Sequence, residues 1–150
     1  DPAGPRCNCG SRGCLEAMVS GVALAERARR ILQQGKSPIL AAIVSGEPPA
    51  ATHLAAAAAR GDTLCEAEIR NAGHLLGLGL GSLVNVLNPD CVTLSGGLLA
   101  IGEMLLAPAR EAFFSLAYGP ASGTRLLLSE LGDDAGILGA AAVAFEYLER

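Results

Sequence analysis

Apolar residues recur every three or four positions over much of the chain, which is the spacing of one face of an α-helix. The pattern predicts a first helix beginning near Leu15 and further helices over 21–34, 37–44, 51–60 and 63–87. Ser20 and Asp62 directly precede two of these stretches, and each is predicted to cap the helix that follows it. The apolar face predicted for the second helix consists of Val22, Leu24, Ala25, Ala28, Ile31 and Leu32.

Within the longest predicted helix, three glycines form a stripe of their own. Gly73, Gly77 and Gly81 are four residues apart and therefore share one face. Glycine costs about 1 kcal/mol relative to alanine inside a helix, so three in register need a reason. Either another helix, in the same chain or in a second subunit, approaches this face closely, or a long helix simply tolerates the glycines.

The pattern changes after residue 90, where short apolar runs replace the helical periodicity. Runs over 91–95 and 124–130 predict two buried strands. Gly96 and Gly97 follow the first strand and lead into a helix. Such a turn lets backbone N–H groups lie close to a ligand, but a plain tight connection explains it equally well.

Two more helices are predicted near the C-terminus. Pro108 is placed in the first turn of a helix that runs to about Ala117, because proline is tolerated at that position. Asp133 or Asp134 is predicted to cap a last helix that runs toward Leu148. The buried positions predicted for this last helix are Ile137, Leu138, Ala141, Val143, Phe145 and Leu148. The fold class is therefore α/β, rich in helices and with a small number of buried strands.

Composition and charge narrow the possible functions. The chain is 51% hydrophobic but only 3% aromatic, which suits closely packed helices better than a β-sandwich. Its net charge is −4 and it has no basic stripe, which argues against a nucleic-acid-binding surface in this segment. No apolar run reaches the roughly 18 residues of a membrane span, and no signal peptide opens the chain. Clustered cysteines without a secretion signal favour a reducing cytoplasm.

Three of the five cysteines lie within eight residues, as Cys7, Cys9 and Cys14. Gly10 and Gly13 between them let the backbone turn tightly enough to aim the three sulfurs at one point. Thiolates this close together repel one another unless a cation lies among them, and zinc is the usual cation. The spacing therefore predicts a metal site.

Arg6 and Arg12 beside this motif add positive charge, which favours the thiolate form. The alternative is a disulfide with one spare thiol. We favour the metal, because a Cys-x-Cys bridge would be a strained ring and an odd thiol would remain.

Three cysteines leave the fourth position of a tetrahedral zinc site open. The two histidines, His53 and His74, lie in predicted helices far along the chain and are interpreted as surface or core residues. Cys65 and Cys91 lie in apolar stretches and are interpreted as buried small hydrophobes. The missing ligand is therefore expected before Asp1.

The sequence CNCGSRGCLE over 7–16 resembles the zinc-loop signature of the ROK family, which comprises bacterial sugar kinases and sugar-responsive repressors. The resemblance extends through NVLNPD at 85–90 and LSGG at 94–97 to GDDAGILGAA at 132–141. It implies the C-terminal part of an actin-like ATPase (ribonuclease H-like) fold. Residues 1–150 would then be the C-terminal domain fragment of a two-domain protein, consistent with a chain that begins at Asp1 without methionine. The final helix, over about 134–150, would pack on the N-terminal domain.

The resemblance also implies roles for individual residues. Cys7, Cys9 and Cys14 would bind a structural zinc together with a histidine upstream of this chain. Glu16 would contact a hexose, where the sequence alone leaves a solvated glutamate equally plausible. Gly96 and Gly97 would form the adenosine-side turn. The catalytic aspartate and the first phosphate loop would lie upstream, so the segment alone would not catalyse phosphoryl transfer.

The resulting hypothesis is part of an ATP-dependent hexose kinase, similar to glucokinase, that uses ATP and Mg²⁺ and forms a homo-oligomer. The first alternative is the effector-binding and dimerisation domain of a ROK-family sugar-responsive transcriptional repressor. A third possibility is a zinc-stabilised dimerisation module whose ligand site has decayed. The sequence upstream of Asp1 would distinguish the first two, through a phosphate loop or a helix-turn-helix.

Overall fold

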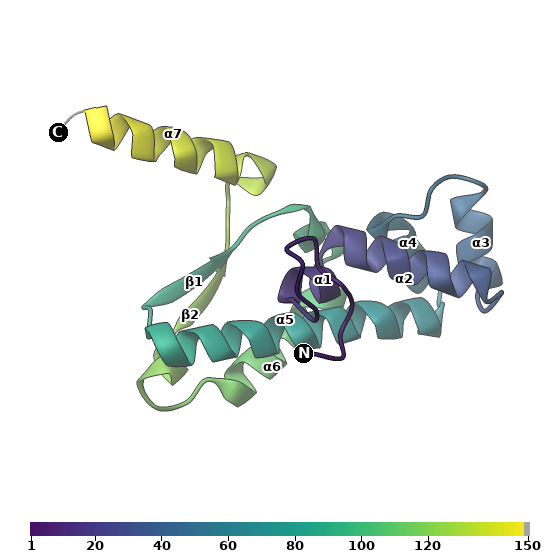
Figure 1. Cartoon of the computed structure of the whole chain (residues 1–150), viewed down its shortest axis with the longest axis horizontal. Helices are drawn as coiled ribbons and strands as arrows, with labels where there is room; N and C mark the ends of the chain where they lie inside the picture. The colour runs from purple at the N-terminus through teal and green to yellow at the C-terminus, as the bar shows by residue number, and fades with distance from the viewer. Residues whose placement is uncertain (149–150) are drawn as a thin grey trace.

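The computed structural model describes residues 1–148, which form seven α-helices and one two-stranded sheet (Figure 1). The helices are α1 (Leu15–Val19), α2 (Gly21–Gln33), α3 (Pro38–Val44), α4 (Ala51–Ala59), α5 (Thr63–Leu87), α6 (Glu103–Leu116) and α7 (Ala135–Leu148). The strands are β1 (Cys91–Leu94) and β2 (Arg125–Leu128). The helices α2 to α5 begin and end within one residue of the bounds predicted from periodicity, so apolar spacing determines this half of the fold.

Polar side chains cap the N-termini of three of these helices. The Ser20 hydroxyl accepts a hydrogen bond from the Ala23 amide at 3.2 Å, as the sequence predicts for the start of α2. The Asp62 carboxylate accepts from the amides of Leu64 and Cys65 at the start of α5, which confirms the second predicted cap. The hydroxyl of Ser37, which caps α3, also donates to Asp62, so one buried contact joins the starts of α3 and α5.

The glycine stripe of α5 lies against α6 of the same chain. A Cβ added at Gly73 would lie 2.2 Å from the Leu105 carbonyl oxygen, and one added at Gly77 would lie 2.2 Å from that of Ala109. At Gly81, an added Cβ would lie 2.9 Å from the Leu116 Cβ. The glycines are therefore present because the backbones of α5 and α6 approach closely, as the first sequence interpretation proposed.

Replacing Gly77 with alanine should destabilise the chain by about 2 kcal/mol, even though alanine is the better helix former. The new methyl group would meet the Ala109 carbonyl and, at 2.7 Å, the Ala112 Cβ, and neither group can rotate away. Urea unfolding measures this difference. Gly21→Ala is the matched control, because a Cβ at the first residue of α2 meets nothing within 4 Å and should change stability by less than about 0.5 kcal/mol. Equal, small effects of the two substitutions would contradict the close approach.

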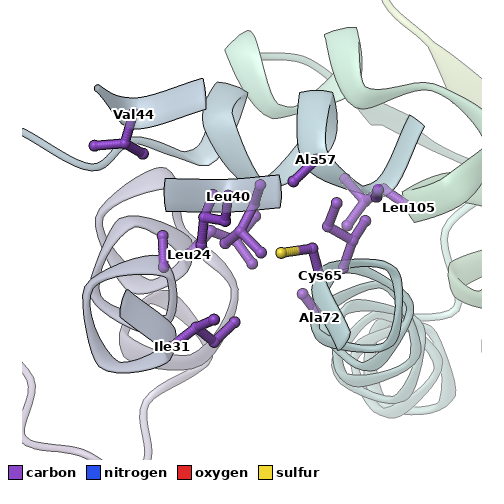
Figure 2. Close-up of a cluster of buried hydrophobic side chains, with 12 residues drawn as sticks. Leu24, Ile31, Leu40, Val44, Ala57, Cys65, Ala72 and Leu105 are labelled. Carbon is purple, nitrogen blue, oxygen red and sulfur yellow. The ribbon is translucent and has the colours of Figure 1, made fainter. Parts of the chain in front are cut away.

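The main core lies among α2, α3, α4 and α5 (Figure 2). Leu24, Leu40 and Ile69 are fully buried there, and the Cys65 sulfur points into the same cluster. Burial, followed by the nearby Asp62 carboxylate, raises the pKa of the Cys65 thiol to about 12. Cys65 is thus a buried, unreactive small side chain, as its apolar sequence context predicts.

The two strands pair in parallel, with Cys91 opposite Arg125 and Leu94 opposite Leu128. One face of this sheet packs on a second buried cluster formed by Leu80, Val84, Phe113, Ala117 and Ala121. The strands are only half buried, which corrects the prediction of buried strands. Cys91 is likewise exposed, because side chains alternate along a strand and this one points to the uncovered face.

Pro108 lies inside α6, not in its first turn as predicted. The helix begins five residues earlier, at Glu103, directly after Gly102 with its positive φ of 73°. Proline removes one helix hydrogen bond at this position. The buried Pro108 ring packs at Gly73, where its Cγ would lie 2.8 Å from an added Cβ.

The helix α7 projects away from the other helices in Figure 1, and none of its described residues is buried. The prediction that it buries an apolar face is therefore wrong within this chain: Ile137 is 74% exposed and Phe145 is 67% exposed. A turn over Gly132–Asp134 precedes α7, and the side chain of Asp133 lies outside the described part of the structure, so its capping role stays a prediction. None of the helices within residues 1–148 is both long and apolar enough to cross a membrane.

Candidate functional site

The cysteine loop is held by its own backbone. The Cys7 amide donates to the Ser11 carbonyl at 2.8 Å, and the Gly13 amide donates to the Pro5 carbonyl at 2.8 Å. Gly13 has a positive φ of 64°, and a Cβ there would lie 1.8 Å from the Asp1 carbonyl oxygen. Only glycine fits this position, so the sequence motif produces the tight turn that its glycines predict.

The turn brings the three predicted sulfurs together. The Sγ atoms of Cys7, Cys9 and Cys14 all lie within 4.8 Å of one another. The Sγ atoms of Cys9 and Cys14 lie 3.5 Å apart, and all three cysteines are free thiols in this structure. The structure therefore contains no disulfide among these three cysteines, although Cys9 and Cys14 lie close together.

Hydrogen bonds within the loop shift the pKa values of Cys9 and Cys14 in opposite directions. The Ser11 amide, followed by the Cys14 and Cys7 thiols, lowers the pKa of Cys9 to about 7. The hydrogen bond with Cys9, followed by that with Cys7, raises the pKa of Cys14 to about 11. Cys9 is therefore the thiol of this pair that loses its proton first, and the thiolate is the form that binds a metal.

The geometry of this sulfur cluster, Cys7, Cys9 and Cys14, fits three corners of a tetrahedral zinc site. Zinc–sulfur bonds of about 2.3 Å place tetrahedral sulfurs about 3.8 Å apart. The Cys9–Cys14 separation of 3.5 Å is close to that value, and Cys7 Sγ lies within 4.8 Å of both other sulfurs. Among residues 1–148, no fourth cysteine, histidine or carboxylate joins the cluster.

Both histidines lie elsewhere, as the sequence interpretation expected. The Nδ1 atom of His53 accepts a hydrogen bond from the Ala50 amide at the start of α4. His74 is exposed on α5, where it lines a separate cavity with Arg70 and Glu111. Neither ring belongs to the sulfur cluster.

Glu16 is the second residue of α1 and lies beside the loop. Its Oε2 atom is 3.9 Å from the Cys7 Sγ, and its side chain is exposed. It lines a cavity of about 190 Å³, which we call the Glu16 cavity. Asn8, Ser20 and Glu26 contribute polar groups to the same walls. Sequence reasoning assigned none of these three residues to a binding site: Ser20 was predicted only as a helix cap, and Glu26 reaches the loop only through the turn between α1 and α2.

Gly96 and Gly97 both line a hollow of about 340 Å³, together with Ser95 and Ser129. Gly96 has a φ of 115°, which side chains other than glycine rarely adopt, and nothing lies within 4 Å of where its Cβ would be. Gly97 lines a cavity of about 560 Å³, here called the Gly97 cavity, whose other walls are mostly apolar. Its lining residues are Gly21, Val22, Ala25, Pro49, Ala50, Ala51, Thr52 and Leu98.

Val22 connects the two cavities. Periodicity predicted it on the buried face of α2, but the structure leaves it 80% exposed, which corrects that prediction. The reason is that α2 begins at Gly21, so its first turn extends past the core into the space between the cavities. Val22 lines both the Glu16 cavity and the Gly97 cavity, so ligands in the two hollows would lie on either side of it.

The chain resembles a known protein family and several of its members. A family model described as ROK matches residues 1–146. The glucokinase of Thermotoga maritima is 36% identical over 99% of this chain and 47% of its own length. The Escherichia coli transcriptional repressor Mlc is 35% identical over 70% of this chain and 25% of its own length. The chain thus spans about half the length of the glucokinases it matches.

The fold of this chain also resembles that of a solved structure from the same family. The ROK family glucokinase from Streptomyces griseus, in complex with glucose and AMPPNP, superimposes with a TM-score of 0.76 at 30% identity. The match covers 95% of this chain and 48% of that one. The fold is therefore part of an actin-like ATPase fold, as the resemblance implied, with more helix than sheet.

Proposed function

The chain belongs to the ROK family, and on that premise we propose that it forms part of an ATP-dependent hexose kinase similar to glucokinase. In this proposal the hexose lies in the Glu16 cavity and the nucleotide lies in the Gly97 cavity. The observation that carries the proposal is the shared wall at Val22, because phosphoryl transfer needs the two substrates to meet. The relatives named as glucokinases support the same assignment.

Zinc is the proposed resident metal, held by Cys7, Cys9 and Cys14. When bound, it would supply a structural cross-link of the loop and would activate no water. The family resemblance places the fourth ligand, a histidine, in a part of the relatives that this chain does not span. The thiol chemistry and the sulfur separations support three of the four ligands.

Glu16 is the proposed hexose ligand. A carboxylate accepts hydrogen bonds from sugar hydroxyls, and a loop fixed by its metal would lose little freedom on binding. Its exposure leaves the carboxylate available, and the cavity also offers Asn8 and Glu26 as further polar partners. This set of groups suits a polyhydroxylated ligand better than an apolar one.

Gly96 and Gly97 are the proposed nucleotide-side residues. Gly97 borders the apolar Gly97 cavity, and a flat base and ribose fit such a surface. Both glycines also line the neighbouring hollow that contains Ser95 and Ser129, where hydroxyl groups are available to a polar part of the nucleotide. ATP and Mg²⁺ would act with the catalytic aspartate that the resemblance places upstream. The chain of 150 residues alone is therefore proposed not to catalyse the reaction.

The exposed apolar face of α7 is proposed to pack on the N-terminal domain of the full protein. Ile137, Val143 and Phe145 are each more than half exposed here, and burying them would provide the contact. Assembly into a homo-oligomer stays a prediction.

A sugar-responsive repressor is the second candidate function. It is favoured by the match to the repressor Mlc, which covers 70% of this chain. In that case the Glu16 cavity would bind an effector sugar, and DNA would be bound by a separate domain. The decayed dimerisation module, the third possibility, would bind no sugar at all.

One experiment separates these functions. The full-length protein should convert glucose and ATP to glucose phosphate and ADP, measured by coupled ADP production. Omitting glucose is the control for simple ATP hydrolysis. Sugar binding without phosphorylation, together with sugar-dependent release from DNA, would contradict the kinase and establish the repressor. No sugar binding of any kind would leave the dimerisation module.

A further inference from the structure

We propose that Arg27 and the contact between Leu15 and Gly79 position helix α1, and thereby hold Glu16 where it can meet a hexose. This inference rests on the proposed sugar-binding role of Glu16. It assigns a positioning role to Arg27 and Gly79, which lie outside both the metal loop and the walls of the Glu16 cavity, and to Leu15, which directly follows Cys14.

The helix α1 needs support from outside itself. It has only five residues, and its N-cap, Cys14, makes no side-chain capping hydrogen bond. Isolated helices of this length are unstable in water, because nucleation costs more than so few hydrogen bonds return. The orientation of Glu16 therefore depends on what holds α1 in place.

Arg27 holds the C-terminal end of α1. Its Nη2 atom donates to the Met18 carbonyl at 2.6 Å, a carbonyl at the helix end that has no partner within the helix. Its Nη1 atom donates to the Glu68 carbonyl of α5 at 3.0 Å and lies 3.4 Å from the Glu68 carboxylate. Arg27 is only 8% exposed, so these hydrogen bonds form where water competes little.

Leu15 holds the other end of α1. Its Cδ2 atom lies 2.8 Å from where a Cβ at Gly79 would be, so the side chain rests on bare backbone of α5. Gly79 lies outside the stripe of Gly73, Gly77 and Gly81 that faces α6, so packing against α6 does not explain it. Both ends of α1 are thus fixed to one rigid helix, and Glu16 follows Leu15 directly.

The alternative is that Arg27 only stabilises the fold, by joining α2 to α5. A purely structural role would lower the melting temperature and affect both substrates alike. A positioning role predicts a selective loss at the hexose, because Glu16 lies on α1 while Gly96 and Gly97 lie on a different part of the chain.

The test uses the full-length protein, at a temperature where each variant is folded, and measures dissociation constants for glucose and for an ATP analogue by calorimetry. Arg27→Met should weaken glucose binding by roughly tenfold or more, because small misplacements of binding groups are costly, and should leave nucleotide binding within about twofold. Arg27→Lys should recover part of the loss, because lysine can still donate to one of the carbonyls. Arg30→Met, an exposed arginine on the same helix, is the matched control and should change neither constant.

A second pair of variants protects the test if Arg27→Met fails to fold. Gly79→Ala should weaken glucose binding, but less than Arg27→Met does. The double variant Leu15→Ala/Gly79→Ala should bind glucose about as weakly as Gly79→Ala alone. Equal losses for glucose and nucleotide, or a lowered melting temperature with unchanged glucose affinity, would overturn the positioning role. Absence of glucose binding by the unaltered protein would instead overturn the proposed function, and this inference with it.

Discussion

Replacing Cys14 with serine in the full-length protein should release most of its zinc and weaken hexose binding by at least roughly tenfold. The serine hydroxyl stays protonated at neutral pH and is a poor zinc ligand, so only two of the three sulfurs would remain. The loop would then rely on its few backbone hydrogen bonds, such as that from Cys7 to Ser11. Zinc content by mass spectrometry and glucose titration by calorimetry measure the two effects together.

Cys91→Ser is the matched control for this experiment. Cys91 is also a free thiol, but it is exposed on β1, outside the sulfur cluster, whereas Cys14 is partly buried. It should keep the full zinc content and unchanged glucose affinity. If Cys14→Ser retained its zinc, or lost zinc without any loss of glucose affinity, the link between the metal loop and the sugar would be wrong.

Glu16→Gln should weaken glucose binding by roughly tenfold to a hundredfold while zinc content stays unchanged. The substitution keeps the size of the side chain but removes the charge that strengthens hydrogen bonds from sugar hydroxyls, which are worth about 1.5–3 kcal/mol to a charged acceptor. Calorimetric titration with glucose measures the loss. Zinc analysis of the same sample separates this effect from that of Cys14→Ser.

Glu111→Gln provides the comparison at an exposed glutamate on α6, which lines a different cavity. It should leave glucose affinity unchanged. Retention of full affinity by Glu16→Gln would show that this carboxylate, exposed beside the Cys7 thiol, is only a solvated helix residue. That was the alternative left open by the sequence.

Local features of the sequence predicted much of the fold and the loop. Apolar spacing predicted α2 to α5 within one residue, and the glycine stripe of α5 correctly indicated a close neighbour. The sulfur cluster was predictable because its three cysteines and two glycines lie within eight residues, where the chain has few ways to turn. In each of these cases, the contacts that determine the structure join residues close together in the sequence or recur with the helical period.

Contacts between distant residues could not be predicted in this way. The hydrogen bond from Arg27 to the Glu68 carbonyl spans 41 residues and leaves no periodic signature. Val22 fits the apolar pattern of α2, yet it lies between two cavities, because periodicity does not show where the core ends. Pro108 was misplaced because the bare surface of Gly73, which accommodates its ring, lies on another helix.

Zinc K-edge X-ray absorption of the full-length protein tests most directly whether Cys7, Cys9 and Cys14 together bind a metal. We expect about one zinc per chain, with three sulfur neighbours at about 2.3 Å and one lighter ligand. A protein without zinc, or zinc with fewer than three sulfur neighbours, would contradict the metal-braced loop and the sugar site built on it.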